Sequence, residues 1–161
     1  MKTLYVDMDG TLAKWNEKAT PQEVASNGYF RNRELQNNLL DALNMLSNDG
    51  YAIYILSSAY QDGHSEDDKK WWLKHHNISF PAIFVPYGDC KKDYVKKEGT
   101  NFLLDDFSHN LREWETDINF VSIKFRNEIN GRKGTWRGAD VSHNLSSKDI
   151  ADKLKEVINA I

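Results

Sequence analysis

Short apolar runs with the residue preferences of β-strands alternate along this chain with stretches whose apolar residues recur at helical spacing. Such alternation is typical of a parallel α/β sheet, because a helix must carry the chain back between neighbouring parallel strands. The apolar runs are residues 4–6, 51–56, 82–85, 102–104 and 120–125. The helical stretches are 34–47, 66–76, 110–115 and a final helix that begins near 146–147. We therefore expect an α/β fold with a central parallel sheet.

Composition narrows the class of protein. A length of 161 residues is typical of one domain and suffices for a sizeable core. The net charge of −3 argues against broad electrostatic binding to nucleic acid. The single cysteine, Cys90, excludes an internal disulfide and fits a reducing compartment. Because we find neither a membrane-length apolar run nor a signal-peptide pattern, we expect a cytoplasmic protein without membrane partners.

The sequence Asp7-Met8-Asp9-Gly10-Thr11 directly follows the first apolar run. Two carboxylates one residue apart at a strand end suit phosphoryl transfer. One can attack phosphorus as a nucleophile, and the other can protonate the leaving oxygen. Gly10 allows a tight turn where a side chain would collide. The alternative is an ordinary Asp-Gly turn after an edge strand, and the rest of the chain decides between the two.

The segment 14–33 interrupts the strand–helix alternation. It carries Trp15, Tyr29 and Phe30 among polar residues, and a direct crossover would not need it. Ligands of α/β proteins bind beyond the carboxyl ends of the strands, which is where this segment begins. We expect it to form a small cap over the site. A surface loop whose aromatic rings fill the core is an equally good interpretation.

Two further strand ends carry groups that can hold phosphate. Ser57-Ser58 ends the second apolar run, and a hydroxyl there can donate to a phosphate oxygen. Lys91-Lys92 follows the third run, and one lysine can neutralise both the phosphate and an aspartyl-phosphate. Taken alone, the serines are more often a turn or cap, and the lysines are more often solvated.

The fourth apolar run ends in Asp105-Asp106. Adjacent acids after a buried strand suit Mg²⁺, a hard cation that takes one or two carboxylates together with substrate phosphate and water. Alone, the pair fits a helix cap equally well. Acid pair, hydroxyl, lysine and acid pair in this order, mostly at strand ends, make coincidence a poor explanation.

This order of motifs resembles the haloacid dehalogenase superfamily. Asp7-x-Asp9-Gly-Thr matches its first motif, Ser57 its second, Lys91 or Lys92 its third, and Asp105-Asp106 its fourth. Residues 1–138 also resemble the 5′(3′)-deoxyribonucleotidase branch of that superfamily. The features behind this second resemblance are Leu12-Ala13, Gly28-Tyr29-Phe30, Trp71-Trp72, Asn110, Trp114 and Asn130-Gly131 with Trp136-Arg137-Gly138.

The resemblance implies a Rossmann-like three-layer sandwich with a small cap after the first strand. It also implies that Asp7 is the nucleophile and a Mg²⁺ ligand. Asp9 is then the general acid and base, and binds the metal through its backbone carbonyl. Asp106 is the preferred metal ligand of its pair, while Asp105 supports the lysine or a metal-bound water.

For the phosphate, the resemblance implies a contact from Ser57, with Ser58 beside it. Lys91 is preferred to Lys92 as the motif lysine, because Tyr94-Val95 then falls where family members place apolar residues. The register between the two lysines stays open.

The leading function is a Mg²⁺-dependent phosphomonoesterase of the nucleotidase type, which dephosphorylates nucleoside monophosphates through an aspartyl-phosphate. Trp15 and Phe30 would then stack on the base. A phosphatase acting on polynucleotide ends, or on another small phosphate ester, is the alternative enzyme. It rests on the basic and aromatic stretches 69–76 and 124–137, although we favour one ring of Trp71-Trp72 in the core and the other at the surface.

A non-catalytic module that binds a phosphorylated ligand is the alternative of another class. The intact set of acids and lysine argues against it, since unpaired charges at strand ends are costly without a ligand.

Overall fold

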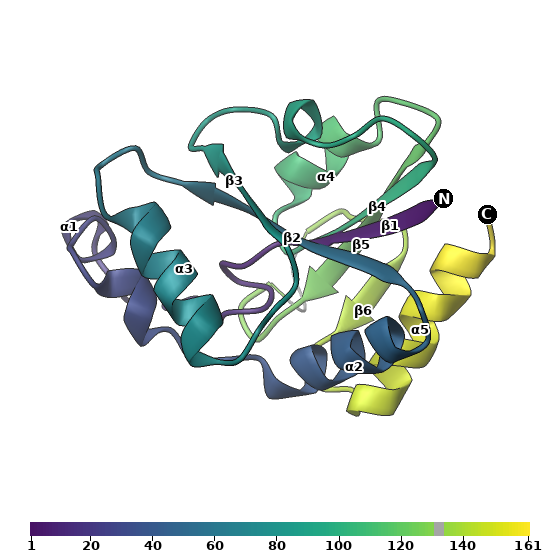
Figure 1. Ribbon diagram of the computed structural model, residues 1–161, viewed down its shortest axis with the longest axis horizontal. Helices are drawn as coiled ribbons and strands as arrows, with labels where there is room; N and C mark the ends of the chain where they lie inside the picture. The colour runs from purple at the N-terminus through teal and green to yellow at the C-terminus, as the bar shows by residue number, and fades with distance from the viewer. Residues whose placement is uncertain (131–133) are drawn as a thin grey trace.

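The computed structural model describes residues 1–130 and 134–161. Within them six strands form a parallel sheet in the order β3-β2-β1-β4-β5-β6 (Figure 1). This confirms the predicted parallel sheet. The strands are β1 (Lys2–Val6), β2 (Ala52–Ala59), β3 (Ala82–Pro86), β4 (Thr100–Asp105), β5 (Phe120–Arg126) and β6 (Asp140–Ser142).

The helices alternate with the strands along most of the chain. They are α1 (Pro21–Val24), α2 (Asn37–Asn48), α3 (Ser65–His75), α4 (Ser108–Trp114) and α5 (Ser147–Asn159), with 3₁₀ turns η1 (Tyr29–Asn32) and η2 (Lys91–Tyr94). Across residues 1–130 and 134–161, no helix combines the length and apolar character needed to cross a membrane.

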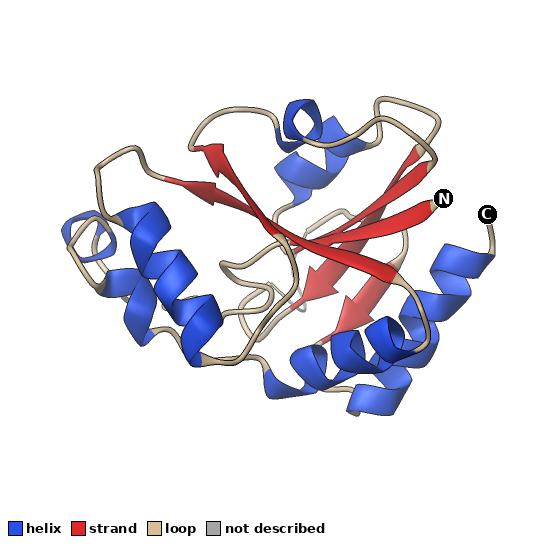
Figure 2. Ribbon diagram, in the orientation of Figure 1, coloured by secondary structure: helices blue, strands red, loops and turns tan. Residues whose placement is uncertain are grey.

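Helices cover both faces of the sheet, which gives three layers (Figure 2). Side chains alternate across β1: Leu4 and Val6 join the core beneath α2 and α5, whereas Tyr5 joins the core beneath α4. Alternation with a period of two is the normal consequence of the strand pleat. Because both faces are buried, the central strands are continuously apolar, which made them recognisable in the sequence.

The boundary of α2 differs from the prediction. Leu35 fits the helical spacing of the predicted stretch 34–47, yet α2 begins only at Asn37. Leu35 instead forms an antiparallel bridge with Ala13, and the Lys14 amide donates to the Glu34 carbonyl at 2.7 Å. Backbone pairing with a distant segment therefore replaces the first helical turn.

Two strands also differ from the prediction. β6 was not predicted, because a three-residue strand leaves too short a pattern to detect. β2 continues through Ser57 and Ser58, which pair with Phe84 and Val85 of β3. The two serines thus belong to the strand itself rather than to the loop after it, and Ser57 is completely buried.

The segment 14–33 folds into α1 and η1 beside α3. The start of α1 has a capping box, in which Thr20 and Glu23 bond each other's backbone amides. Val24, Tyr29 and Phe30 form a small apolar cluster of their own. The buried Asp68 of α3 accepts hydrogen bonds from the Gly28 amide at 2.7 Å and from Arg31 Nε at 2.6 Å, which ties the segment to the main body.

Candidate active site

A cavity of about 560 Å³ opens at the carboxyl ends of β1, β2 and β4, beneath the segment 14–33. Acidic and aromatic side chains dominate its lining. The lining residues are Asp7, Asp9, Trp15, Phe30, Ser58, Tyr60, Lys69, Tyr87, Gly88, Asp89, Lys91, Asp105, Asp106, Phe107, His109, Asn110 and Glu113. Three segments far apart in the sequence thus meet at one edge of the sheet, as the strand-end pattern predicts.

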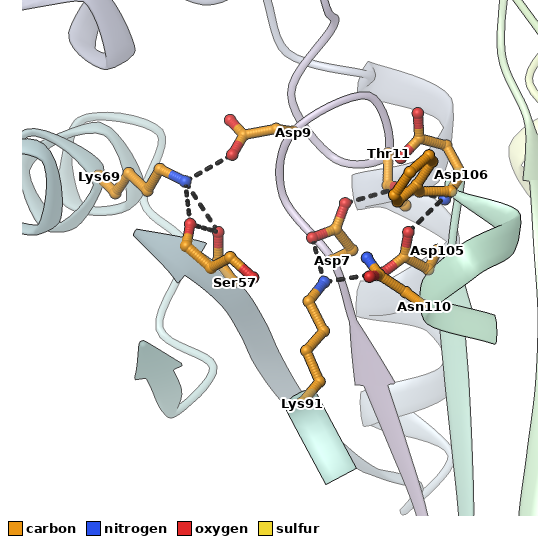
Figure 3. A network of polar contacts seen from close by, with 11 residues as sticks. Asp7, Asp9, Thr11, Ser57, Lys69, Lys91, Asp105, Asp106 and Asn110 are labelled. Atoms are coloured by element: carbon orange, nitrogen blue, oxygen red, sulfur yellow. Dashed lines mark hydrogen bonds and ion pairs between the residues drawn. The ribbon is translucent and has the colours of Figure 1, made fainter. Parts of the chain in front are cut away.

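Asp7 follows β1 directly and holds the centre of the site (Figure 3). Its amide donates to the Leu104 carbonyl at 3.0 Å, which fixes the backbone between β1 and β4. One carboxylate oxygen accepts from Lys91 Nζ at 2.6 Å, and the other accepts from Thr11 Oγ1 at 3.3 Å. Asp7 therefore faces the cavity with its orientation set from two sides.

Lys91 joins two carboxylates. Its ammonium lies 2.6 Å from Asp7 Oδ1 and 2.7 Å from Asp105 Oδ2, and the side chain is buried. Burial alone would lower the pKa of Lys91, but the charges of Asp105 and Asp7 outweigh it and raise that pKa well above its usual range. The lysine is therefore a permanent cation inside the acid cluster.

The Asp7 carboxyl has a pKa raised to about 7. Burial is the largest cause, the charge of Asp105 adds to it, and Lys91 opposes both. The pKa of Asp106 is also raised, first by burial and then by Asp105 and Asp7. One lysine thus compensates only part of the negative charge gathered here.

The two acids at the end of β4, Asp105 and Asp106, accept different numbers of hydrogen bonds from the described residues. Asp105 accepts hydrogen bonds from Lys91, from Asn110 Nδ2 at 3.0 Å and from the Phe107 amide at 2.8 Å. Within residues 1–130 and 134–161, the carboxylate of Asp106 accepts one hydrogen bond, from Asn127 Nδ2 at 3.2 Å. Among these residues, Asp106 is therefore the acid of the pair whose carboxylate is less occupied by protein donors.

The turn after β1 packs directly against Asp106. Gly10 has a φ of 83°, and a Cβ on it would collide with the Asp106 carboxylate. Asn127, which follows β5, donates to the Gly10 carbonyl at 2.7 Å as well as to Asp106. Thr11 Oγ1 accepts from the Asp106 amide at 3.1 Å. Glycine is therefore required at position 10 by both backbone conformation and space.

A divalent cation fits this cluster. Carboxylate oxygens of Asp7, Asp105 and Asp106 lie within 4.8 Å of one another. Burial and then the charge of Asp105 raise the pKa of both Asp7 and Asp106, and Lys91 is the one cation that contacts the cluster among the described residues. Hard oxygen donors with uncompensated charge are what Mg²⁺ selects.

A second buried lysine, which the sequence analysis did not select, lies across the site from Lys91 (Figure 3). Lys69 of α3 is 1% exposed. Its ammonium contacts Asp9 Oδ2 at 2.5 Å, Ser57 Oγ at 3.1 Å and the Ser58 carbonyl at 2.5 Å. In the sequence, residues 69–76 indicate only a basic and aromatic stretch, and no local pattern marks one lysine within it as buried.

Of the other residues predicted to bind phosphate, one lines the cavity and two do not. Ser58 lines the cavity, whereas the buried Ser57 contacts Lys69 and is absent from the lining. Lys92 lies outside the cavity, with its ammonium at Thr116 and 2.9 Å from Asp117. Of the two lysines, Lys91 is therefore the one that lies in the cavity and contacts Asp7 and Asp105.

Aromatic rings form the outer wall of the cavity. Trp15 and Phe30, the residues expected to stack on a base, both line it. Phe30 is buried, with Lys69 Nζ 4.4 Å from its ring centroid, while Trp15 is 38% exposed. Tyr87 and Phe107 are more exposed still and were not predicted as site residues.

The two tryptophans of α3 divide as expected. Trp72 is fully buried and donates to the Arg33 carbonyl at 2.8 Å, whereas Trp71 is 40% exposed. The basic stretch 124–137 and the Asn130-Gly131 feature fall partly on residues 131–133, outside the described residues.

Comparison with known proteins bears on the fold. No family model and no curated protein matches the sequence. A D,D-heptose 1,7-bisphosphate phosphatase from Burkholderia thailandensis matches with a TM-score of 0.62 and 14% identity, over 98% of this chain and 99% of that chain.

A chain in the Pnkp1/Rnl/Hen1 complex matches with a TM-score of 0.60 and 19% identity, over 76% of this chain and 45% of that chain. The match thus spans less than half of that longer chain. A second structure, of the Pnkp1/Rnl/Hen1 RNA repair complex, gives a TM-score of 0.59 at 18% identity. At these identities the likeness concerns the fold alone: this chain has a Rossmann-like α/β fold with a parallel sheet, similar to that of the heptose bisphosphate phosphatase.

Proposed function

We propose that this protein is a Mg²⁺-dependent phosphomonoesterase that works through an aspartyl-phosphate on Asp7. One observation carries the proposal. Asp7 faces the cavity beside a buried lysine, within a carboxylate cluster that fits a divalent cation. The fold shared with a bisphosphate phosphatase is consistent with this chemistry.

Asp7 and Asp106 would hold the Mg²⁺, together with the backbone carbonyl of Asp9. The three hydrogen bonds that the Asp105 carboxylate accepts support its role as a partner of Lys91 rather than a direct ligand. When bound, Mg²⁺ neutralises the charge that the phosphate brings into the cluster.

The chain's own residues carry the proton and bond changes. A carboxylate oxygen of Asp7 forms a bond to phosphorus while the ester P–O bond breaks, and the protonated Asp9 gives its proton to the departing oxygen. Asp9 then takes a proton from water as the water oxygen attacks the same phosphorus, which releases phosphate and restores Asp7. Lys91 stays charged throughout and stabilises the oxygens of the transferred phosphoryl group.

The substrate we propose is a nucleoside monophosphate. Trp15 offers a partly exposed ring at the mouth of the cavity, and Tyr87 and Phe107 add further exposed rings. Planar bases stack on such rings. Phe30 packs against Tyr29 and Tyr60 and beneath Lys69, so it is better suited to support the wall than to bind the base.

A phosphatase acting on polynucleotide ends is the second candidate. The fold match to a chain of an RNA repair complex favours it, as does the open aromatic mouth of the cavity. Among the described lining residues, however, the lysines are Lys69 and Lys91, and both are paired with carboxylates.

The test is phosphate release from a chromogenic phosphate ester, from a panel of nucleoside monophosphates and from a 3′-phosphorylated oligonucleotide. We expect Mg²⁺-dependent turnover that EDTA removes, with the monophosphates preferred. Asp7→Asn, which is nearly isosteric, should abolish turnover and leave the fold intact. Asp152→Asn, an exposed acid on α5, is the matched control. Comparable kcat in Asp7→Asn would remove Asp7 from the nucleophile role, and preference for the oligonucleotide would favour the second candidate.

A further inference from the structure

Lys69 is buried to an extent that is rare for a lysine, and its position is not accounted for by the mechanism above. It projects from the middle of α3 toward the cavity and is 1% exposed. Lysines are seldom buried unless they are paired. The partner of Lys69 is Asp9, the proposed acid and base, whose side chain is 22% exposed at the cavity edge.

The hydrogen bonds of Lys69 are all used within the protein. An ammonium group has three hydrogens, and three acceptors surround this one: Asp9 Oδ2, Ser57 Oγ and the Ser58 carbonyl. The ring of Phe30 covers it, 4.4 Å away. Lys69 is thus held by β2 and by the segment 14–33, with no hydrogen left over for a substrate.

Asp9 depends on this contact. Within the part of the chain that the structure describes, Lys69 is the one hydrogen-bonding side chain that the Asp9 carboxylate has. Asp7, by contrast, is held by both Lys91 and Thr11. The direction of the Asp9 carboxylate therefore rests on a rigid cation anchored in the sheet.

We propose that Lys69 is a positioning residue, which orients the Asp9 carboxylate toward the leaving oxygen of the substrate and does not itself contact the phosphate. This inference rests on the proposed function, because it assigns Lys69 to the proton transfer of that reaction. The proposal predicts that the effect of losing Lys69 depends on the leaving group of the ester. A purely structural ion pair, or a direct phosphate contact, would affect all esters alike.

The experiment compares two phosphate esters in the Lys69→Met variant. An alkyl ester such as phenylethyl phosphate needs a proton on its leaving oxygen, whereas 2,4-dinitrophenyl phosphate has a leaving group stable without one. General acid catalysis contributes about 10²–10⁴-fold. We therefore expect kcat/KM for the alkyl ester to fall about 10–100-fold, and that for the dinitrophenyl ester to fall less than about threefold.

The kcat/KM value reports steps up to formation of the aspartyl-phosphate, so the water attack shared by both esters does not mask the difference. Lys70→Met is the matched control, since Lys70 lies next to Lys69 on α3 but is exposed and paired with Glu66. It should leave both esters unchanged. Should the methionine variant fail to fold by circular dichroism, Lys69→Gln replaces it under the same criteria.

A double-mutant cycle tests whether Lys69 acts through Asp9. In the Asp9→Asn background, Lys69→Met should cause no further loss with the alkyl ester. An equal fall with both esters, no fall with either, or an undiminished further loss in the Asp9→Asn background would overturn the proposal. If the wild-type protein hydrolyses neither ester with Mg²⁺, the proposed function itself fails, and this inference fails with it.

Discussion

Replacement of Lys91 by methionine should destabilise the protein strongly and in a pH-dependent way. Lys91 lies within 2.7 Å of both Asp7 and Asp105 and is buried. Removing one partner of a buried ion pair costs about 3–5 kcal/mol, because the remaining charge is left uncompensated. Methionine retains the length and apolar stem of lysine, so the change removes mainly the charge.

The raised pKa of Asp7 gives a second, independent value for the free-energy cost of charge in this cluster. Burial and Asp105 already raise the pKa of Asp7 from 3.8 to about 7 even with Lys91 in place. Each unit of pKa shift corresponds to about 1.4 kcal/mol, so a carboxyl moved that far costs about 4 kcal/mol of stability once it is ionised in the unfolded state. Lys91→Met should raise the pKa of Asp7 further, and each further unit should cost about 1.4 kcal/mol of stability at a pH above the new value.

The sign of the pH dependence follows from the raised pKa. A carboxyl with a raised pKa in the folded state costs nothing below its unfolded pKa, near 4, and its cost grows as the pH rises toward the folded value. Below about pH 7 Asp7 is protonated in both folded proteins, so the difference in unfolding free energy between wild type and Lys91→Met should be small near pH 4.5. It should grow by about 1.4 kcal/mol per pH unit above pH 7 and reach about 2–3 kcal/mol near pH 9.

The assay is urea unfolding without metal at pH 4.5 and pH 9, followed by circular dichroism. Lys92→Met is the control, because Lys92 lies outside the cavity beside Asp117 and should leave the unfolding free energy almost unchanged. A loss below about 1 kcal/mol at pH 9, or an equal loss at both pH values, would refute the view of a charge-coupled acid cluster.

The remaining predictions concern the cavity mouth and the loop before α3. Trp15→Ala should raise KM for a nucleoside monophosphate about five- to hundredfold with little change in kcat, since a stacked base contributes about 1–3 kcal/mol. Hydrolysis of an ester without a base should not change. An equal loss of kcat on all substrates would show that the Trp15 ring has a structural role. Asp62 lies two residues before the N-cap of α3 and accepts hydrogen bonds from the Ser65 amide at 2.8 Å and the His64 amide at 3.0 Å. Although burial would raise the pKa of Asp62, the hydrogen bonds from Ser65 and His64 lower it to about 2. Its stabilising contribution should therefore be complete above pH 4 and be lost as the pH falls toward 2. Asp62→Asn removes the charge but keeps an acceptor oxygen, so it should cost about 1–2 kcal/mol at pH 7 and much less near pH 2 in urea unfolding. An equal cost at both pH values would contradict a role for the charge of Asp62.

The sequence alone indicated the central parallel strands and the acids at the edge of the sheet. Central strands of a parallel sheet are buried on both faces, so Leu4–Val6 and Phe102–Leu104 are apolar without interruption and are visible as local patterns. Because the strands are parallel, Asp7 and Asp105-Asp106 had to meet at one edge. These conclusions depend only on neighbours in the sequence and on the regular geometry of strands.

Tertiary structure alone decided which polar side chains serve that edge. Two adjacent lysines are equivalent in the sequence, but the 3₁₀ turn η2 directs Lys91 to Asp7 and leaves Lys92 at Asp117. Lys69 and Asn127 contact residues 60 and 117 positions away, and no local pattern encodes such contacts. The physical reason is range: hydrophobic periodicity acts along a few residues, whereas the burial and pairing of a charge depend on segments that only the folded chain brings together.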